Sequence, residues 1–213
     1  TAVVGYQLMR LAASQGIRVV LNGQGADETI GGYSSYFQDY WVSLLQQGHV
    51  SAAWQAATAY TEAHGGNSRV RMTEAVSRCL SWEMYKIGAY RKWAQSRRQA
   101  RLRQNPWFST DLTNHFLNQD VPPSLATLSN SLKQSVVSAP LPLYLRIEDR
   151  NSMAHSVEAR LPFLDYRLVS FVCGLPDDWK VRGPWNKYVL REGMRGRIPE
   201  SVRSRVDKMG FPT

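Results

Sequence analysis

The sequence predicts a mainly α-helical fragment of an α/β domain, with only one or a few parallel strands. Apart from Arg18, residues 17–21 are apolar and mostly β-branched, which is typical of a buried parallel strand. A helical pattern precedes this run, a glycine-rich loop follows it, and most of the remaining chain has helical periodicity. Because one strand cannot form a sheet, we expect that the N-terminal part of a larger α/β domain precedes these residues.

Length and composition are those of one globular domain, which we take to span residues 1–213. Hydrophobic residues make up 43% of the sequence and charged residues 20%, with no apolar run of about 18 residues that would cross a membrane. No basic leader with a cleavage site is present, so we expect a cytoplasmic location. Cys79 and Cys173 lie far apart in helical patterns, which favours two buried thiols over a disulfide or a metal site.

The net charge of +9 is concentrated in one stretch. Residues 86–103 contain seven Lys and Arg side chains and no acid, interleaved with Tyr90 and Trp93. Such a stretch could bind nucleic acid. We prefer the simpler interpretation of a basic helix face that is solvated or meets another domain, so a nucleic-acid partner is not expected.

Helical periodicity and helix-ending residues predict the elements in order. The first helix covers residues 2–15 and stops at Gly16, before the strand at 17–21. After the loop, the predicted helices cover residues 35–47, 50–63, 69–103 (as one helix or two, with Gly88 as the weak point), 109–115, 124–139, 143–153, 166–173 and 187–194, with a short last helix from Pro199. Pro162 favours an extended Leu161, and Asp165 is a candidate N-cap for the helix that follows it.

The loop after the strand, residues 22–33, is the candidate site. Gly23 and Gly25 allow backbone angles that other residues avoid, and Asp27 follows the strand end, where α/β sheets place ligands. The spacing fits neither the dinucleotide fingerprint nor the Walker loop. Two interpretations stay open on this pattern alone. One is a tight strand-to-helix turn with surface acids, and the other is a phosphate-facing loop in which Asp27 holds a divalent cation.

Four sequence blocks together resemble the synthetase domain of the glutamine-dependent asparagine synthetases. They are LNGQGADETIGGY at 21–33, SMAHSVEARLPFLD at 152–165, KYVLRE at 187–192 and DKMGF at 207–211. The resemblance implies an α/β fold of the adenine-nucleotide α-hydrolase-like (PP-loop ATP pyrophosphatase) type. It also implies a partial domain with the nucleotide site in 1–33, helical support in 34–138, and the substrate and pyrophosphate side in 139–213.

In that family a glutaminase domain and a Ser-Gly-Gly-x-Asp-Ser pyrophosphate loop precede these blocks. We therefore expect the chain to begin after that loop and to stop before the natural end, and we expect the isolated fragment to be inactive. The resemblance implies ATP and Mg²⁺ as cofactors, aspartate or a related carboxylate as acceptor, and the N-terminal glutaminase domain as partner. A homodimer stays open. The implied reaction forms an acyl-adenylate and pyrophosphate, and glutamine-derived ammonia then gives the amide.

The family's site residues carry over to seven positions of this sequence. Asn22, Gly23 and Gln24 fall in the nucleotide-contacting loop. Asp27 falls on the Mg²⁺ ligand, and Lys187 on the lysine that contacts pyrophosphate, so that it also has a catalytic role. Tyr33 and Glu148, the latter followed by Asp149 and Arg150, lie near positions that in relatives bind substrate or assist proton transfer.

Gln24 departs from the family, which has Glu at this position. An amide cannot act as a base at neutral pH. Either another group such as Glu148 takes that role, or the acceptor differs, as in relatives that amidate other carboxylates or close β-lactam or peptide rings. A catalytically silent homologue or scaffold is the remaining alternative. For Glu158 and Arg160 the sequence favours a structural ion pair that fixes the substrate-side loop.

Overall fold

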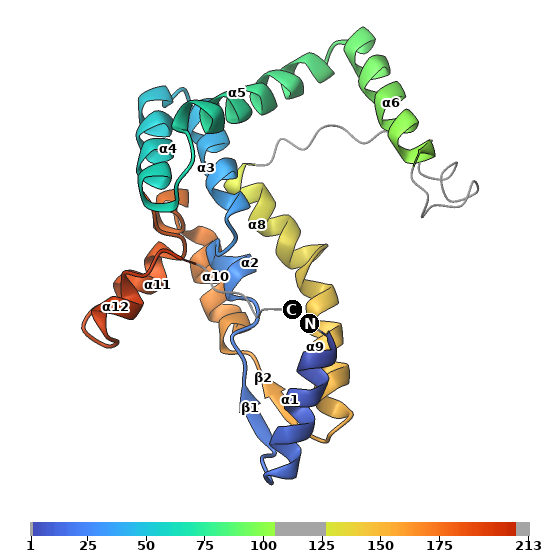
Figure 1. The fold of residues 1–213 in the computed structure, drawn as a ribbon, viewed down its shortest axis with the longest axis vertical. Helices are drawn as coiled ribbons and strands as arrows, with labels where there is room; N and C mark the ends of the chain where they lie inside the picture. Colours follow the sequence, from blue (N-terminus) through green and yellow to red (C-terminus); the bar gives the residue numbers. More distant parts are fainter. Residues whose placement is uncertain (1, 105–126, 208–213) are drawn as a thin grey trace.

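The computed structural model describes residues 2–104 and 127–207. This part of the chain is mainly helical and carries a two-stranded parallel sheet near one end (Figure 1). The predicted combination of many helices with few parallel strands is therefore confirmed. None of the described helices is long and apolar enough to cross a membrane.

The helices and strands follow the predicted order, and their bounds mostly differ by one to four residues. They are α1 (Ala2–Ser14), β1 (Val19–Leu21), α2 (Ala26–Ile30), α3 (Ser35–Gln46), α4 (Val50–His64), α5 (Ser68–Tyr85), α6 (Gly88–Arg103), α8 (Leu128–Val137), α9 (Leu141–Met153), β2 (Glu158–Arg160), α10 (Tyr166–Gly174), α11 (Tyr188–Gly193) and α12 (Glu200–Arg203), with the 3-10 turns η1 (Pro162–Leu164) and η2 (Asp177–Trp179). The helix predicted at 109–115 lies outside the described residues.

The sheet differs from the prediction in two ways. First, β2 pairs in parallel with β1, with Val20 opposite Ala159. This second strand was missed because its sequence, Glu-Ala-Arg, has no apolar pattern. Second, β1 is not buried among the described residues, since Leu21 is 77% exposed and Val19 41%. In the described chain β1 has one strand neighbour, so most of its apolar surface has nothing to pack against.

Helices α1 and α9 lie side by side next to the sheet (Figure 1). Asn151 on α9 donates from its Nδ2 to the carbonyl of Ala2, 3.0 Å away, and Gly5 lies close to the same side chain. Met9 is the buried residue of α1. This pairing brings α9, from the C-terminal half of the chain, next to the end of β1, where the candidate loop begins.

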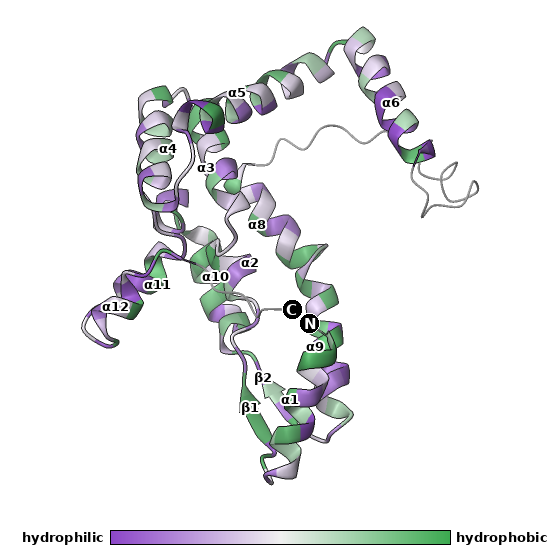
Figure 2. Cartoon of the chain, in the orientation of Figure 1, coloured by the Kyte–Doolittle hydropathy of each residue, from purple (hydrophilic) through white to green (hydrophobic). Residues whose placement is uncertain are grey.

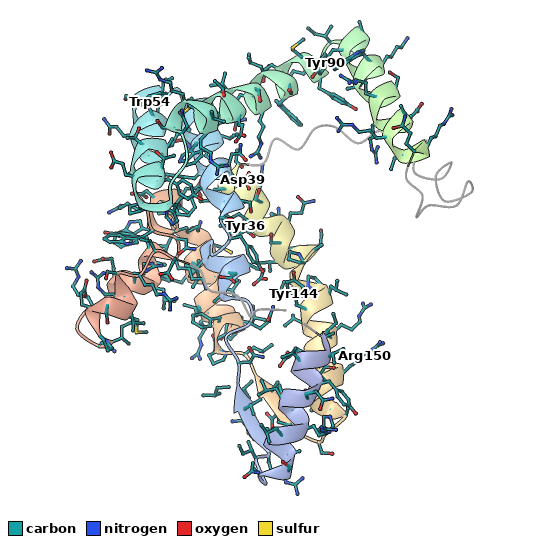
Figure 3. The ribbon with its side chains drawn as sticks, in the orientation of Figure 1. Tyr36, Asp39, Trp54, Tyr90, Tyr144 and Arg150 are labelled. Atoms are coloured by element: carbon teal, nitrogen blue, oxygen red, sulfur yellow. The ribbon has the colours of Figure 1, made fainter. Side chains whose placement is uncertain are left out.

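The hydrophobic core lies in α3, α4, α5 and α8. Its centre is aromatic: the Phe37 and Trp41 rings lie 4.6 Å and 5.5 Å from the Tyr60 ring, measured between centroids. The core also holds polar contacts, of which the Tyr36 hydroxyl to Ser135 Oγ (2.7 Å) links α3 to α8 (Figure 3). The helical pattern of residues 35–63 thus corresponds to a packed helical layer.

Helices α5 and α6 form an arm that extends from this layer (Figure 1). The long helical pattern at 69–103 breaks at Ile87, whose extended backbone (φ −83°, ψ 119°) precedes Gly88, so the two-helix alternative is correct. No described residue of α6 is buried, and Figure 2 colours several of its residues as hydrophilic. Among the described residues nothing buries the basic stretch, so a solvated face and a face that meets another domain both stay predictions.

Four smaller expectations are settled by the structure. Asp165 caps α10 as predicted, since its carboxylate accepts from the Arg167 backbone N–H at 2.9 Å. The prediction of two buried thiols is wrong for Cys173, which is exposed on α10, and Cys79 is only partly buried. Helix α2 was expected as loop, and Pro199 lies at the N-cap of α12 rather than within its first turn.

Candidate functional site

The loop after β1 is shaped by backbone contacts with the β2–η1 segment. The Asn22 N–H donates to the carbonyl of Arg160 (2.9 Å), which continues the parallel ladder past the end of β1. Gly25 then turns the chain with φ 92°, and a Cβ there would overlap the side chain of Leu164. Glycine is required at this position by both its backbone angle and this close approach. Helix α2 starts directly afterwards.

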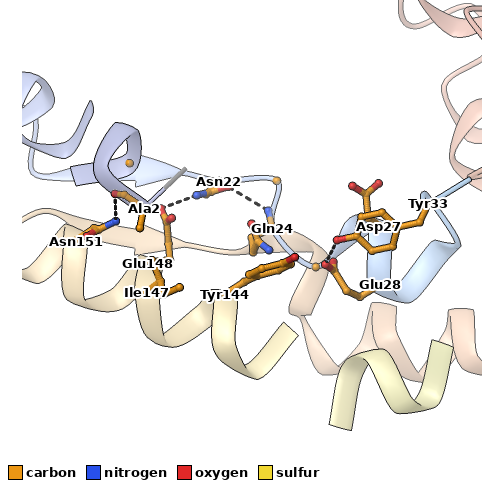
Figure 4. Close-up of a pocket in the computed structure, with 13 residues that line it drawn as sticks. Ala2, Asn22, Gln24, Asp27, Glu28, Tyr33, Tyr144, Ile147, Glu148 and Asn151 are labelled. Carbon is orange, nitrogen blue, oxygen red and sulfur yellow. Dashed lines mark hydrogen bonds between the residues drawn. The ribbon is translucent and has the colours of Figure 1, made fainter. Parts of the chain in front are cut away.

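A cavity of about 380 Å³ opens beside this loop (Figure 4). The loop forms one wall, α1 and α9 form the other, and the acids of α2 close one end. Its lining residues are Ala2, Gly5, Asn22, Gly23, Gln24, Gly25, Asp27, Glu28, Tyr33, Tyr144, Ile147, Glu148 and Asn151. Six of the seven site residues that the resemblance indicated therefore line one cavity, although 126 positions separate Asn22 from Glu148.

Asn22 connects the loop to α9. Its Nδ2 donates to Glu148 Oε1 at 2.6 Å, and its Oδ1 accepts from the Gln24 backbone N–H at 3.1 Å. One amide side chain therefore fixes the turn of the loop and orients the Glu148 carboxylate at the cavity wall. Figure 4 shows Gln24 and Tyr144 between this pair and the acids of α2.

Tyr33 and Glu28 form a second polar pair. The Tyr33 hydroxyl donates to Glu28 Oε1 at 2.5 Å, and Glu28 is only 1% exposed. Burial, the hydrogen bond to Glu28 and the charge of that carboxylate raise the pKa of Tyr33 well above its usual value. The phenol therefore stays protonated across the physiological range and serves as a hydrogen-bond donor rather than a base.

Asp27 is paired with Lys187. The Lys187 Nζ lies 2.6 Å from Asp27 Oδ1, with about a quarter of each side chain exposed. Lys187 does not line the cavity; it approaches Asp27 from the start of α11. A Cβ at Gly32 would overlap Asp27 Oδ1 and Lys187 Cε, so this close approach depends on glycine. The seventh predicted residue thus joins the other six through an ion pair.

The structure adds residues that the sequence did not single out. Asn186 donates from Nδ2 to the Gly32 carbonyl (2.8 Å), and the Arg191 guanidinium donates to Asn186 O (2.8 Å) and Oδ1 (3.0 Å). Burial lowers the pKa of Arg191, with a smaller contribution from Arg203. On α9, Tyr144 precedes Glu148 by one helical turn; this i, i+4 spacing is the signal that could have identified it.

The described residues can supply only part of the coordination of a Mg²⁺ ion. No group of three or more His, Cys, Asp and Glu side chains that could hold a metal occurs in residues 2–104 and 127–207. Mg²⁺ commonly uses one or two carboxylates and completes its coordination with water and phosphate oxygens. Asp27 can supply one carboxylate beside the cavity, so its chemistry fits a cation that is held mainly by a phosphate-bearing substrate.

Glu158 and Arg160 form the expected ion pair, with Glu158 Oε1 2.9 Å from Arg160 Nε. Both side chains project from the same face of β2 and are mostly exposed. Hydrogen bonding to Arg160 lowers the pKa of Glu158. Exposed ion pairs contribute little to stability. The backbone hydrogen bonds between β1 and β2 and the contact between Gly25 and Leu164 therefore hold this segment more than the ion pair does.

Comparison with known proteins identifies a family. The family model described as asparagine synthase matches residues 1–213. Asparagine synthetase [glutamine-hydrolyzing] 1 of Bacillus subtilis is 27% identical over 94% of this chain and 31% of its own length. A putative asparagine synthetase [glutamine-hydrolyzing] of Mycobacterium tuberculosis is also 27% identical, over 94% of the chain and 30% of its own length.

A more distant match is amidase chry2 of Gibberella zeae, which is 24% identical over 89% of this chain and 31% of its own length. The chain therefore spans about a third of the length of these relatives. No solved structure matches it significantly.

Proposed function

The chain belongs to the asparagine synthase family, and from that premise we propose that it is part of an ATP-dependent amidotransferase. In the full-length protein, a substrate carboxylate attacks the α-phosphate of ATP, giving an acyl-adenylate and releasing pyrophosphate. Ammonia from a glutaminase domain then attacks the acyl carbon, and the amide and AMP leave. In this proposal the chain is part of an α/β domain of the PP-loop ATP pyrophosphatase type.

The observation that carries this proposal is that Asn22, Asp27 and Glu148 line one cavity, while Lys187, from a third segment, reaches Asp27 through an ion pair. Adenylyl transfer depends on fixed charges that neutralise a developing pyrophosphate. Lys187, as a compact ammonium, suits contact with that leaving group. Asp27 would hold Mg²⁺, which when bound supplies additional positive charge at the phosphates.

Proton transfer in the second step is assigned to Glu148. Ammonia becomes positively charged when it attacks a carbonyl carbon, so a base must take a proton. Gln24 cannot do this. Glu148 lines the same cavity from the α9 wall, and its carboxylate is oriented by Asn22. Tyr33, whose one O–H is donated to Glu28, is proposed to contact the substrate as a hydrogen-bond acceptor through its hydroxyl oxygen.

Aspartate is the proposed acceptor because the most similar relatives are named asparagine synthetases. The alternative is a related carboxylate, which the Gln24 departure favours. The two are separated by comparing aspartate with other amino-acid and aliphatic carboxylates in an assay of pyrophosphate release. If a different carboxylate is strongly preferred, the proposed reaction type stands and the proposed acceptor is wrong.

The proposal is tested by Asp27→Ala in the full-length protein. The expected result is a loss of about a hundredfold or more in carboxylate-dependent ATP–pyrophosphate exchange, because one electrostatic element of the site is removed. Asp178→Ala is the matched control, since Asp178 also forms an ion pair, with Arg182, but lies outside the cavity. Exchange that survives Asp27→Ala unchanged would refute the assignment of Asp27.

A further inference from the structure

The Asp27–Lys187 pair involves the two residues that are proposed to act on the metal and on the pyrophosphate. Their charged atoms lie 2.6 Å apart, which is a direct contact between Nζ and Oδ1. The side chains are about three-quarters buried, so this pair is screened less than a surface pair. Lys187 and a divalent cation would therefore be alternative partners for the same carboxylate.

The backbone around Lys187 is set for this contact. Lys187 has φ 50° and ψ 38°, a left-handed conformation that is unfavourable for a non-glycine residue. The preceding residue, Asn186, is held to Gly32 and to Arg191. Arg191 also donates from Nη1 to the carbonyls of Arg203 (2.6 Å) and Arg205 (2.7 Å). The lysine is thus placed by surrounding hydrogen bonds rather than by chance contact of a flexible side chain.

We propose that Lys187 and a divalent cation compete for the Asp27 carboxylate, so that Asp27 accepts the cation only together with a phosphate group that binds Lys187. This inference rests on the function proposed above. An ammonium beside the carboxylate repels a second positive charge, and the described residues offer no group of three or more His, Cys, Asp and Glu ligands to offset that repulsion. A polyphosphate removes the conflict because it supplies oxygen ligands to both cations.

The consequence is coupled binding. The free metal ion binds weakly, and the metal enters as its complex with the nucleotide triphosphate. Such coupling is reciprocal, so a cation at Asp27 also strengthens the contact between Lys187 and phosphate. Lys187 is then a positioning residue for the metal as well as a contact for pyrophosphate.

The test measures binding of Mn²⁺ alone, by electron paramagnetic resonance of the free ion, to the full-length protein. Lys187→Met removes the competing charge, and we expect Mn²⁺ to bind about fivefold or more tightly than to the unmodified protein. Lys187→Gly is a second neutral variant that suits the left-handed backbone and guards against misfolding of the first. Lys86→Met is the matched control, because it releases Glu83 from an exposed ion pair of similar length.

The gain should disappear in the double variant Asp27→Asn/Lys187→Met, and Lys86→Met should leave Mn²⁺ binding unchanged. Equal Mn²⁺ affinity in the unmodified protein and in both folded Lys187 variants overturns the competition. A gain that persists in the double variant also overturns it, since the ion would then sit elsewhere. This readout needs no acceptor and no turnover, so its failure is distinguishable from failure of the exchange assay.

Discussion

The helical core and the cavity are held together by different kinds of contact. In the core, apolar side chains from α3, α4, α5 and α8 bury almost their whole surface. At the cavity, a few polar contacts join distant segments: Asn22 to Glu148, Asn186 to Gly32, and Asp27 to Lys187. Apolar burial is additive and large, whereas each polar pair contributes little net free energy. Stability and site geometry are therefore separable by substitution.

The largest effect on stability is expected from Trp41→Ala. Trp41 is 1% exposed at the centre of the core, and truncation of a buried Trp costs about 3–5 kcal/mol of unfolding free energy. The measurement is urea unfolding followed by circular dichroism. At temperatures where the variant stays folded, ATP–pyrophosphate exchange per folded molecule should be unchanged. A loss of exchange in the folded variant would show that core and cavity are coupled.

Asn22→Ala should lower activity more than stability, which is the reverse of the effect expected from Trp41→Ala. It removes two partly buried hydrogen bonds, one to Glu148 and one from the Gln24 N–H, so the expected loss of stability is about 1–3 kcal/mol. Amide formation should fall much more, because Glu148 loses its orientation. Asn130→Ala, on the exposed side of α8, is the control for removing an amide side chain. Equal losses in both variants would contradict a specific role for Asn22.

The smallest effect on folding is expected from charge reversal on α6, Arg97→Glu/Arg101→Glu. No described residue of α6 is buried, so stability should change by less than about 0.5 kcal/mol. The same variant tests the nucleic-acid alternative. A gel shift at low salt that is present in the unmodified protein and lost in the variant would support that alternative. We expect no shift in either protein, since the Arg97 guanidinium already lies over the Trp93 ring.

Sequence periodicity was sufficient for the longer described helices because each one is specified locally, whereas the short α2 was expected as loop. The pattern at 35–63 and the break near Gly88 both depend on residues within a turn or two of each other. Strand β2 could not be predicted in this way. Its three residues have no strand pattern, and they adopt an extended conformation because β1, far away in sequence, offers a hydrogen-bonding edge.

The candidate site also contains some residues that a local sequence pattern identifies and others that only tertiary contacts bring into it. The loop glycines and Asp27 were visible in one stretch, and the resemblance supplied Glu148 and Lys187. Neither Asn186 nor Arg191 was identified, since their roles arise from contacts with Gly32 and with the carbonyls near α12. Such contacts depend on tertiary packing and leave no local pattern. Roles for the predicted residues stay predictions until the exchange and binding assays are done.

The parallel pairing of β1 with β2 has a consequence for the order of folding. Val20 and Ala159 meet only after a very long loop has closed, whereas the contacts among α3, α4 and α5 close short loops. Loop-closure entropy makes the long-range pairing slow. We therefore expect the helical layer to gain amide protection first in pulsed hydrogen exchange and the cavity walls to assemble last. Simultaneous protection of both regions would contradict this sequence of events.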